Sequence, residues 1–559
     1  MSQTTSQEKL PQPIDRGSNV EASNEEQHTV EYSLLRAVVL ILTCTMAMVL
    51  NIANSTMVSI ALPIIGHDLN IPSERLQWLV SAYSLSSGCF LVFFGRLADL
   101  YGRKRVFVAG SLWLAVFSLG LGFANGAFPS ASEHEVALLT RILVPTDEIT
   151  LDILRGFQGI GAAATIPSSV GIIAGAFPPS RMRSFALATF SAGAPMGAAI
   201  GMILGAAGLS AATTVLGMFS IDADLPSTEK DTRVDWLGAL LVTAGLVLIV
   251  FVLSEGEIAG WKTAYIIALL IVGVICMVLF VLWEHYLEHV HENHSEEALN
   301  SRWTPPPLMK TSIWGRAKGK FAAAMLIAFL NWSAFLAWQF WVQVWYWQLY
   351  YQDYLNLSPI LTMVRLLPMF VTGILCNFAI ALSIGWVSLV VIVVLGTLLT
   401  GTASLLFALI NPSSPYWAFG FPAAVIVVFG ADFVFASGTI FVAKISLPHE
   451  QSLTGALFNT MTQIGTAFGL TISTIVYDRV VARDESSIDS HSATLKGYKA
   501  AQWTAFGFAM LSAVLATMFL RGVGIVGYSK HSVIQDEKAA REKEQHESAL
   551  SLDAPTIVN

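Results

Sequence analysis

Residues 95–105 read GRLADLYGRKR, a stretch that places five charged side chains between two long apolar segments. Of the 559 residues, 54% are hydrophobic and only 13% are charged, whereas a soluble domain carries about a quarter charged residues. The apolar residues form segments of about 20 residues, long enough to cross a bilayer core of roughly 30 Å as helices. The sequence therefore predicts an all-α polytopic membrane protein. Residues 95–105 then form a turn at the membrane surface, because backbone polar groups must be satisfied inside the bilayer.

The apolar segments predict about fourteen spans and a topology. The expected spans are 37–60, 76–97, 105–125, 151–176, 184–204, 206–221, 236–254, 264–283, 321–345, 358–382, 386–410, 416–443, 452–477 and 501–521. An even number puts both termini on one side of the membrane. Most of the 31 lysines and arginines then fall in cytoplasmic segments, as the positive-inside rule requires. We expect no cleaved signal peptide, because the first apolar segment is too long for one.

The domain organisation follows from these spans. We expect disordered cytoplasmic tails at 1–35 and 523–559, an N-terminal helix bundle at 36–221, a central two-span hairpin at 236–283, a C-terminal bundle at 321–522, and cytoplasmic loops at 222–235 and 284–320. The four cysteines are far apart within apolar segments and are interpreted as packing residues.

Two regions fit this plan poorly. Residues 184–221 carry no charge, and one helix over them would be about 57 Å long. Two spans there need a near-zero loop and a short second helix. Residues 126–148 form an unusually long outer loop between two spans. One hypothesis is an error in the gene model, with a retained intron near 127–147 and a lost exon segment near Ala206; the alternative is that the chain is real.

The charged turn has its own chemistry. Gly95 and Gly102 allow close approach and tight backbone geometry. Arg103 and Lys104 hold the turn on the cytoplasmic side. Asp99 lies among these cations as an ion-pair partner, and it could also face a helix N-terminus. The simplest interpretation is a topology anchor, although the full spacing is more specific than an anchor requires.

Four segments resemble the Major Facilitator Superfamily. GRLADLYGRKR resembles its signature loop between spans 2 and 3, and LDILRGFQGIGAA (151–163) resembles its span-4 motif. SAGAPMGAAIGMILG (191–205) resembles the Gly-Pro motif of antiporters, with Ala194 where glycine is usual. LPHEQSLTGALFNTMTQIGTAFG (447–469) is similar to fungal aminotriazole-resistance-type members of the 14-span drug:proton antiporter branch.

The resemblance implies a fold and gating residues. The implied fold has two six-helix bundles plus a central two-helix insertion. The implied gate is an ion-pair latch between the bundles on the cytoplasmic side, formed by Asp99 and Arg103. The candidate gating residues are Gly95, Asp99, Gly102, Arg103 and Lys104.

Four residues are candidates for proton coupling. Arg155 lies inside span 4, where a lone charge costs several kcal/mol unless it is paired or hydrated, and the resemblance ties it to proton coupling. A structural pair with Asp152, or snorkelling to the outer surface, is the alternative. Asp432 lies deep in the C-terminal spans and is a candidate proton carrier, or a hydrogen-bonded structural carboxylate. Arg365 is its candidate partner.

Two motifs combine packing with possible function. The span-4 motif contributes Gln158, Gly159 and Gly161, and the antiporter-type motif contributes Gly193, Pro195, Gly197 and Gly201. Glycines four residues apart form a small-residue face for close helix packing. The resemblance adds a second role, which is sealing the bundle against a proton leak.

Five residues are candidates for a substrate cavity. They are Asn51 and Asn54 in span 1, and Trp338, Gln339 and Gln343 in span 9. An aromatic belt at the outer interface explains the neighbouring residues 345–354 equally well. Antiporters of related branches often carry an acid in span 1, which is absent here.

The sequence favours a proton-coupled exporter of a small organic molecule, either a drug, a toxin or a fungal secondary metabolite. Export of an inorganic solute such as borate or ammonium is an alternative, as is a sensor that binds without transporting. No catalytic constellation argues for an enzyme, and HYLEHVHENH (285–294) is interpreted as a solvated loop, not a metal site. We expect no cofactor beyond the proton gradient, and a monomer whose partners are a small-molecule substrate, protons and the lipid bilayer, with no nucleic acid. The expected location is the plasma membrane, with the vacuolar membrane as the alternative.

Overall fold

The computed structural model describes residues 33–525, with gaps at 70–72, 125–147, 202–205, 223–230, 232, 257, 293–300, 302, 343–358, 384, 412 and 485–489. The α-helices in the described part are α1 (Leu34–Leu69), α2 (Ser73–Cys89), α3 (Leu91–Tyr101), α4 (Arg103–Ala124), α6 (Glu148–Ala176), α7 (Arg181–Gly201), α8 (Ala206–Ser220), α9 (Trp236–Glu255), α10 (Ala264–Glu292), α12 (Lys320–Trp341), α13 (Pro359–Ser383), α14 (Leu389–Ala408), α15 (Tyr416–Ile445), α16 (Gln451–Asp484) and α17 (Ser490–Phe519). Two 3₁₀ turns, η1 (Thr311–Gly315) and η3 (Pro448–Glu450), precede α12 and α16. The described residues contain no strand, so the predicted all-α fold is confirmed.

The helices are suited to a bilayer. Nine helices in the described part are long and apolar enough to span a membrane. The clearest is α10, which exposes a row of large aliphatic side chains, among them Ile267, Ile271, Ile275 and Leu282. A helix that is apolar on every side is stable only where apolar surroundings cover it. These exposed side chains therefore face lipid.

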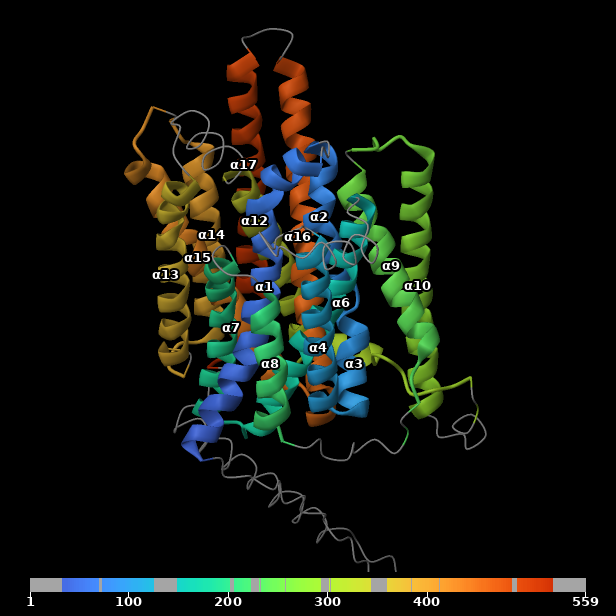
Figure 1. Cartoon of the computed structure of the whole chain (residues 1–559). Coiled ribbons are helices and arrows are strands. Elements are labelled where there is room, and N and C mark those ends of the chain that lie inside the picture. Colours follow the sequence, from blue (N-terminus) through green and yellow to red (C-terminus); the bar gives the residue numbers. More distant parts are fainter. Residues whose placement is uncertain are drawn as a thin grey trace, which may run out of the picture.

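The helices form two bundles that meet along two seams (Figure 1). In the N-terminal bundle α1 packs on α7, and α6 packs on α2 and α4. In the C-terminal bundle α12 packs on α16 and α17, and α14 packs on α15 and α17. The bundles touch where α3 meets α16 and where α7 meets α13.

The central hairpin lies beside one of these seams. Helix α9 packs on α10 and also contacts α2, α3 and α16, so it reaches both bundles. Trp78 on α2 donates its indole N–H to Glu255 on α9 at 2.8 Å. The Thr471 hydroxyl on α16 lies 2.8 Å from the carbonyl oxygen of Leu253 on α9 and equally far from that of Ala467 in its own helix, and it donates to both. The hairpin thus bridges α2 and α16.

Four helices are longer than the apolar segments predict. Helix α1 continues to Leu69 instead of ending near residue 60, and α10 continues to Glu292, so residues 285–292 are helical and the prediction of a loop there was wrong. Helix α16 continues to Asp484, and α17 begins at Ser490 instead of near residue 501. Both helices rise above the others at the top of Figure 1. An aromatic cluster joins them to α12: the ring of Trp341 stacks on Tyr477 with centroids 4.6 Å apart and meets Tyr498 edge-on. A hydropathy pattern marks only the apolar part of a helix that lies within the bilayer. The polar extension beyond it was therefore not predicted.

Two further predicted regions are each divided into two helices. The span predicted at 76–97 is divided at Phe90 into α2 and α3, next to the Ser87–Gly88 pair, and such pairs commonly mark helix bends. The uncharged region 184–221 forms α7 followed by the 15-residue α8, which packs on α1 and α4. The long loop and most of both tails lie outside the described residues.

Candidate transport site

Asp99 joins the two bundles at the end of the molecule where α1 begins. Its carboxylate is fully buried and accepts hydrogen bonds from the backbone N–H groups of Leu453 at 2.9 Å and Ser452 at 3.3 Å. These are free N–H groups of the first turn of α16, which favour a negative charge. The N-terminal bundle therefore supplies a charged cap for a C-terminal helix.

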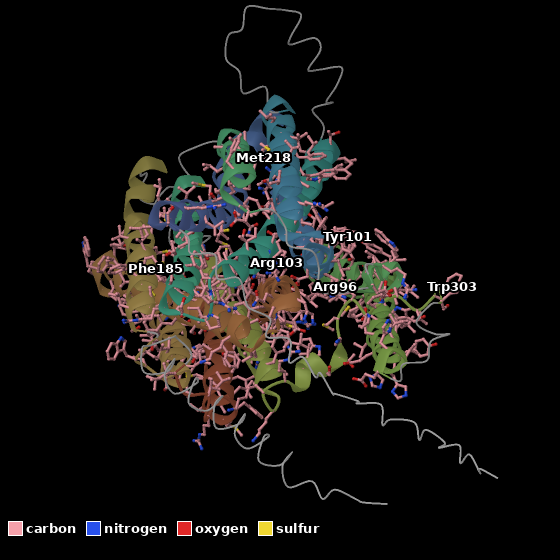
Figure 2. The ribbon with its side chains drawn as sticks, turned by 90° about the horizontal axis from the view of Figure 1, so that it is seen from below. Arg96, Tyr101, Arg103, Phe185, Met218 and Trp303 are labelled. Carbon is pink, nitrogen blue, oxygen red and sulfur yellow. The ribbon has the colours of Figure 1, made fainter. Side chains whose placement is uncertain are left out.

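Arg103 completes this junction. It forms an ion pair with Asp99, with the terminal nitrogen Nη2 3.0 Å from Oδ1. The same guanidinium donates to the carbonyl oxygen of Gly171 on α6 at 2.8 Å and to that of Pro448 at 2.6 Å. In Figure 2, which views this end of the molecule, Arg103 lies near the middle of the helix ends. We call Asp99, Arg103 and residues 448–453 the latch.

The glycines of the charged turn fit this junction. A Cβ atom on Gly95 would lie 2.6 Å from the Cβ of Ala456 and 3.0 Å from the backbone oxygen of Ser452. Gly102 has a φ of 110°, which other residues rarely adopt. Lys104 donates to the backbone oxygen of Ile221 at the end of α8.

Two arginines that the sequence analysis did not select make further contacts here. Arg183 on α7 donates to the carbonyl oxygen of Ala443 at 2.6 Å, across the bundles. Arg316 forms an ion pair with the buried Glu450. Partial burial lowers the pKa of Arg316 from its usual value, and the guanidinium stays charged at neutral pH.

Arg155 is the centre of a polar network inside the N-terminal bundle. It is fully buried, and its Nε donates to the carbonyl oxygen of Leu79 at 2.8 Å. Its Nη1 donates to Gln158 Oε1 at 2.6 Å, and its guanidinium lies 4.7 Å from the ring centroid of Tyr83. The guanidinium is fully buried, so it does not snorkel to the surface. Asp152, one turn earlier on α6, interacts with it electrostatically.

The span-4 motif places this network between three helices. Gln158 donates to Asn54 Oδ1 on α1 and to Ser118 Oγ on α4, both at 2.7 Å. A Cβ atom on Gly159 would lie 2.4 Å from the backbone oxygen of Tyr83, and one on Gly161 would lie 2.9 Å from backbone atoms of α4. The two glycines therefore allow α2 and α4 to approach α6.

The antiporter-type motif lies on α7 between two neighbours. Cβ atoms on Gly193 and Gly197 would lie within 3 Å of α1, so these glycines permit close packing within the N-terminal bundle. Pro195 instead faces the other bundle. A Cβ atom on Gly373 of α13 would lie only 2.4 Å from the Cβ of Pro195. Gly201 ends α7, and nothing further is described at it.

Asp432 lies near the same seam. On α15 it accepts a hydrogen bond from Asn377 Nδ2 on α13 at 2.7 Å. Asn377 lies one turn from Gly373, and Asp432 lies one turn from Val428, whose side chain is close to Gly373. The predicted pairing of Asp432 with Arg365 concerns a side chain outside the described ones.

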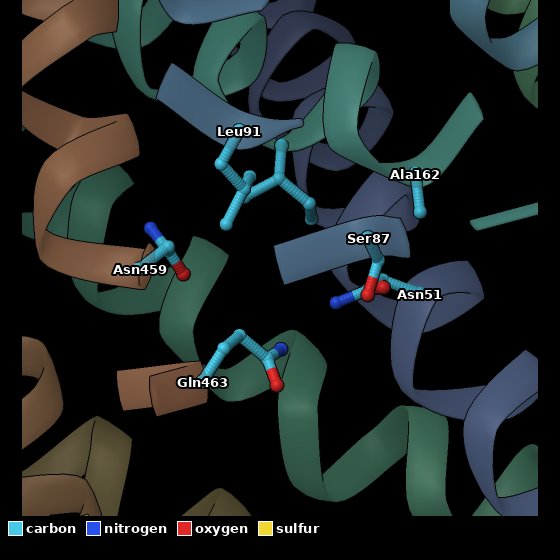
Figure 3. Close-up of a pocket in the computed structure, with 7 residues that line it drawn as sticks. Asn51, Ser87, Leu91, Ala162, Asn459 and Gln463 are labelled. Carbon is cyan, nitrogen blue, oxygen red and sulfur yellow. The ribbon is translucent and has the colours of Figure 1, made fainter. Parts of the chain in front are cut away.

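A small cavity lies between the two bundles. Its volume is about 10 Å³, and it is lined by Asn51, Ser87, Leu91, Ala162, Ile166, Asn459 and Gln463 (Figure 3). These residues come from α1, α2, α3 and α6 of one bundle and α16 of the other. The Tyr83 hydroxyl donates to Asn51 Oδ1 at 2.8 Å, which connects the cavity to Arg155.

Of the residues predicted to line a substrate cavity, one does so in the structure and the other described ones lie elsewhere. Asn51 lines it, whereas Asn54 is buried in the Arg155 network. Trp338 does not line it, because its ring packs edge-on against Phe407 in the core of the C-terminal bundle. Gln339 is half-buried, and Gln343 lies outside the described residues.

Several residues of the site escaped the sequence analysis. They are Tyr83 and Ser118 in the Arg155 network, Ser87 in the cavity wall, and Asn459 and Gln463 on α16. The two amides are four residues apart within 447–469, the segment that resembles fungal transporters, and this spacing places them on one helical face. Hydroxyl and tyrosine side chains carried no comparable signal, because spans contain many of them.

Comparison with known proteins gives the following matches. Residues 44–470 match the family model of the Major Facilitator Superfamily. The low affinity ammonium transporter of Saccharomyces cerevisiae is 27% identical over 82% of this chain and 83% of its own length. The aminotriazole resistance protein of the same yeast is 25% identical, with 86% and 83% covered, and the efflux pump terJ of Aspergillus terreus is 24% identical, with 95% and 96% covered.

Two solved structures share the fold. The human organic anion transporter MFSD10 aligns with a TM-score of 0.55 at 14% identity, over 86% of this chain and 99% of its own. The proton:xylose symporter XylE aligns with a TM-score of 0.53 at 11% identity, over 89% and 99%. At these identities the likeness concerns the fold alone.

Proposed function

Since this chain belongs to the Major Facilitator Superfamily, we propose that it is a transporter that exports a small organic molecule in exchange for protons. The predicted resemblance to fungal efflux transporters of this superfamily is confirmed by the matches to the aminotriazole resistance protein and to terJ. The direction of transport, the proton coupling and the substrate class are our proposal.

The proposed motion is a rocking of the two bundles about the central cavity. In this conformation Asp99 and Arg103 hold the cytoplasmic ends together through residues 448–453. Loading substrate from the cytoplasm requires these hydrogen bonds to break, which exposes a buried carboxylate and the first turn of α16 together. The latch therefore acts as the cytoplasmic gate. The small cavity is the substrate site as it remains when this gate is closed.

The observation that carries the proposal is the path from Arg155 to the cavity. A buried guanidinium is costly in a membrane protein and is retained where it has a function. Arg155 contacts Tyr83, whose hydroxyl donates to Asn51 in the cavity wall. A substrate that binds Asn51 thus perturbs the hydrogen bonding of Tyr83 and, through it, the packing of the guanidinium.

We assign the proton to Asp432. Its carboxylate accepts from Asn377 one helical turn from the contact between Gly373 and Pro195. Opening of the seam between α7 and α13 changes the access of water to this carboxylate. A proton taken up there from the outer side and released to the cytoplasm supplies the energy for export.

The test is internal pH in proteoliposomes that are acid-loaded and then exposed to azoles, fungal toxins, 3-amino-1,2,4-triazole, ammonium and borate. The proposal expects compound-dependent proton release, which is lost in Asp432→Asn. Asp478→Asn, at an exposed acid near the outer end of α16, is the matched control and retains the response. A compound-dependent response that survives in Asp432→Asn contradicts the assignment, and no response to any compound contradicts the function.

The match to an ammonium transporter favours a second candidate, a small inorganic solute. Ammonium and borate are included in the panel for this reason. Proton exchange with these two solutes alone would replace the organic substrate by an inorganic one.

A further inference from the structure

The described residues that line the central cavity carry no ionisable side chain. Its polar groups are the amides of Asn51, Asn459 and Gln463 and the hydroxyl of Ser87, and the rest is aliphatic. Figure 3 shows these polar side chains converging from two sides of the seam. These side chains determine which molecules the cavity can bind once the bundles move apart and the cavity becomes larger.

The amides retain unused hydrogen-bonding groups. Asn51 Oδ1 accepts from Tyr83, which leaves its NH₂ group available. Asn459 Nδ2 donates to the carbonyl oxygen of Gly455 at 2.9 Å, which leaves its oxygen available. Gln463 makes no hydrogen bond within the described part of the chain, so both its donor and its acceptor remain. The cavity therefore presents donors and acceptors next to each other.

Fixed charges are kept away from the cavity. Arg155 is separated from it by the ring of Tyr83, over which the guanidinium lies. Helix α16 carries no charged residue from 452 to 477. A charged solute moved into this wall would lose its water without gaining a counter-ion, which is unfavourable.

We propose that the substrate is an uncharged molecule with adjacent hydrogen-bond donor and acceptor atoms, such as a carboxamide, a lactam or an azole. Side-chain amides pair with such an edge through two parallel hydrogen bonds, while Leu91 and Ile166 contact the apolar part of the molecule. This inference rests on the proposed export function and narrows its substrate. Asn459 and Gln463 are then specificity-determining residues.

Matched compounds that differ only in charge test the proposal. The probes are nicotinamide, nicotinate and 1-methylnicotinamide, and benzamide, benzoate and benzamidinium. Radiolabelled counterflow is measured in proteoliposomes. The uncharged member of at least one set is expected to exchange at least tenfold faster than both charged members.

Two variants separate recognition from structural support. Asn459→Asp and Gln463→Glu keep the size of the side chain and add a negative charge. Each is expected to reduce the uncharged flux at least tenfold and to raise the flux of benzamidinium or 1-methylnicotinamide. A merely destabilised protein loses all fluxes together and gains none. Asn411→Asp, in an exposed turn between α14 and α15, is the control that leaves the preference unchanged.

Three results would overturn the inference. They are faster exchange of a charged member in both sets, unchanged preference in both carboxylate variants, and no exchange of any uncharged member. If the compound panel of the pH assay still drives proton release, only the substrate class is wrong. If that panel is also silent, the export function itself fails.

Discussion

The Asp99 carboxylate of the N-terminal bundle accepts the backbone N–H of Leu453, at the start of α16 in the C-terminal bundle, at 2.9 Å. Arg103 binds the same carboxylate and two backbone carbonyls on either side of the seam. The buried Asp99 carboxylate therefore pairs with a cation, caps the start of α16 and joins the two bundles at the same place. The junction can hold the bundles closed, and it can release them only as a unit.

The latch predicts a change in accessibility. Asp99→Asn removes the charge that pairs with Arg103 and caps α16, and a buried charged hydrogen bond contributes about 1.5–3 kcal/mol. We expect faster maleimide labelling, from the side of the membrane where the latch lies, of a cysteine placed at Ala456, which packs against Gly95. Asp222→Asn, which removes an ion pair with Arg36 within the N-terminal bundle, is the control. Equal labelling rates in the two variants would mean that Asp99 does not close this side.

The α7–α13 seam predicts sensitivity to a single methyl group. Gly373→Ala would place its Cβ 2.4 Å from that of Pro195, and overpacking costs about 1–3 kcal/mol. We expect a lower thermal unfolding temperature of the purified protein and slower proton exchange. Gly507→Ala, which adds its methyl to open space on α17, is the matched control. A Gly373→Ala protein as stable and active as Gly507→Ala would show that the seam is not tightly packed in solution.

The buried network predicts that charge alone is insufficient at residue 155. Arg155→Lys keeps the charge, but a single ammonium cannot reproduce the fork that reaches Leu79 and Gln158 while lying over Tyr83. Proton exchange in liposomes should fall at least tenfold. The control is Lys262→Gln, in the exposed turn between α9 and α10. If Arg155→Lys were as active as the unmodified protein, a positive charge alone would be sufficient at this position.

The hairpin predicts a modest stabilising role at the bridged seam. Thr471→Val removes the hydroxyl that donates to Leu253 on α9 and should lower stability by about 0.5–1.5 kcal/mol. Thr402→Val is the matched control, because the exposed Thr402 hydroxyl bonds only to the preceding turn of its own helix. Thermal unfolding of the two variants in one lipid mixture decides the matter. A larger loss in Thr402→Val would be incompatible with a bridge through α9.

Much of the fold could be predicted from the sequence, and the site only in part. Apolar length and charge asymmetry predict the spans, because the bilayer imposes both. The motif spacing predicts that Asp99 faces a partner cation or a helix end, and the structure has both at once. The length of α16 and α17 beyond the bilayer leaves no hydropathy signal.

The residues that line the cavity could not be predicted from residue type alone. Trp338 and Asn51 look equally suitable in sequence, but one is packed against Phe407 and the other lies at the seam. Which face of a helix meets the other bundle depends on packing between segments distant along the chain. The same holds for Arg183, whose acceptor on Ala443 is 260 residues away.

Uphill accumulation driven by a proton gradient tests the central claim most directly. Proteoliposomes with an acidic lumen are supplied with labelled nicotinamide, or with another compound active in the pH assay, and uptake is followed with and without a proton ionophore. The account predicts accumulation above the external concentration, collapse on addition of the ionophore, and no accumulation in Asp432→Asn. Equal uptake with and without the gradient would identify a passive carrier and contradict proton-coupled export.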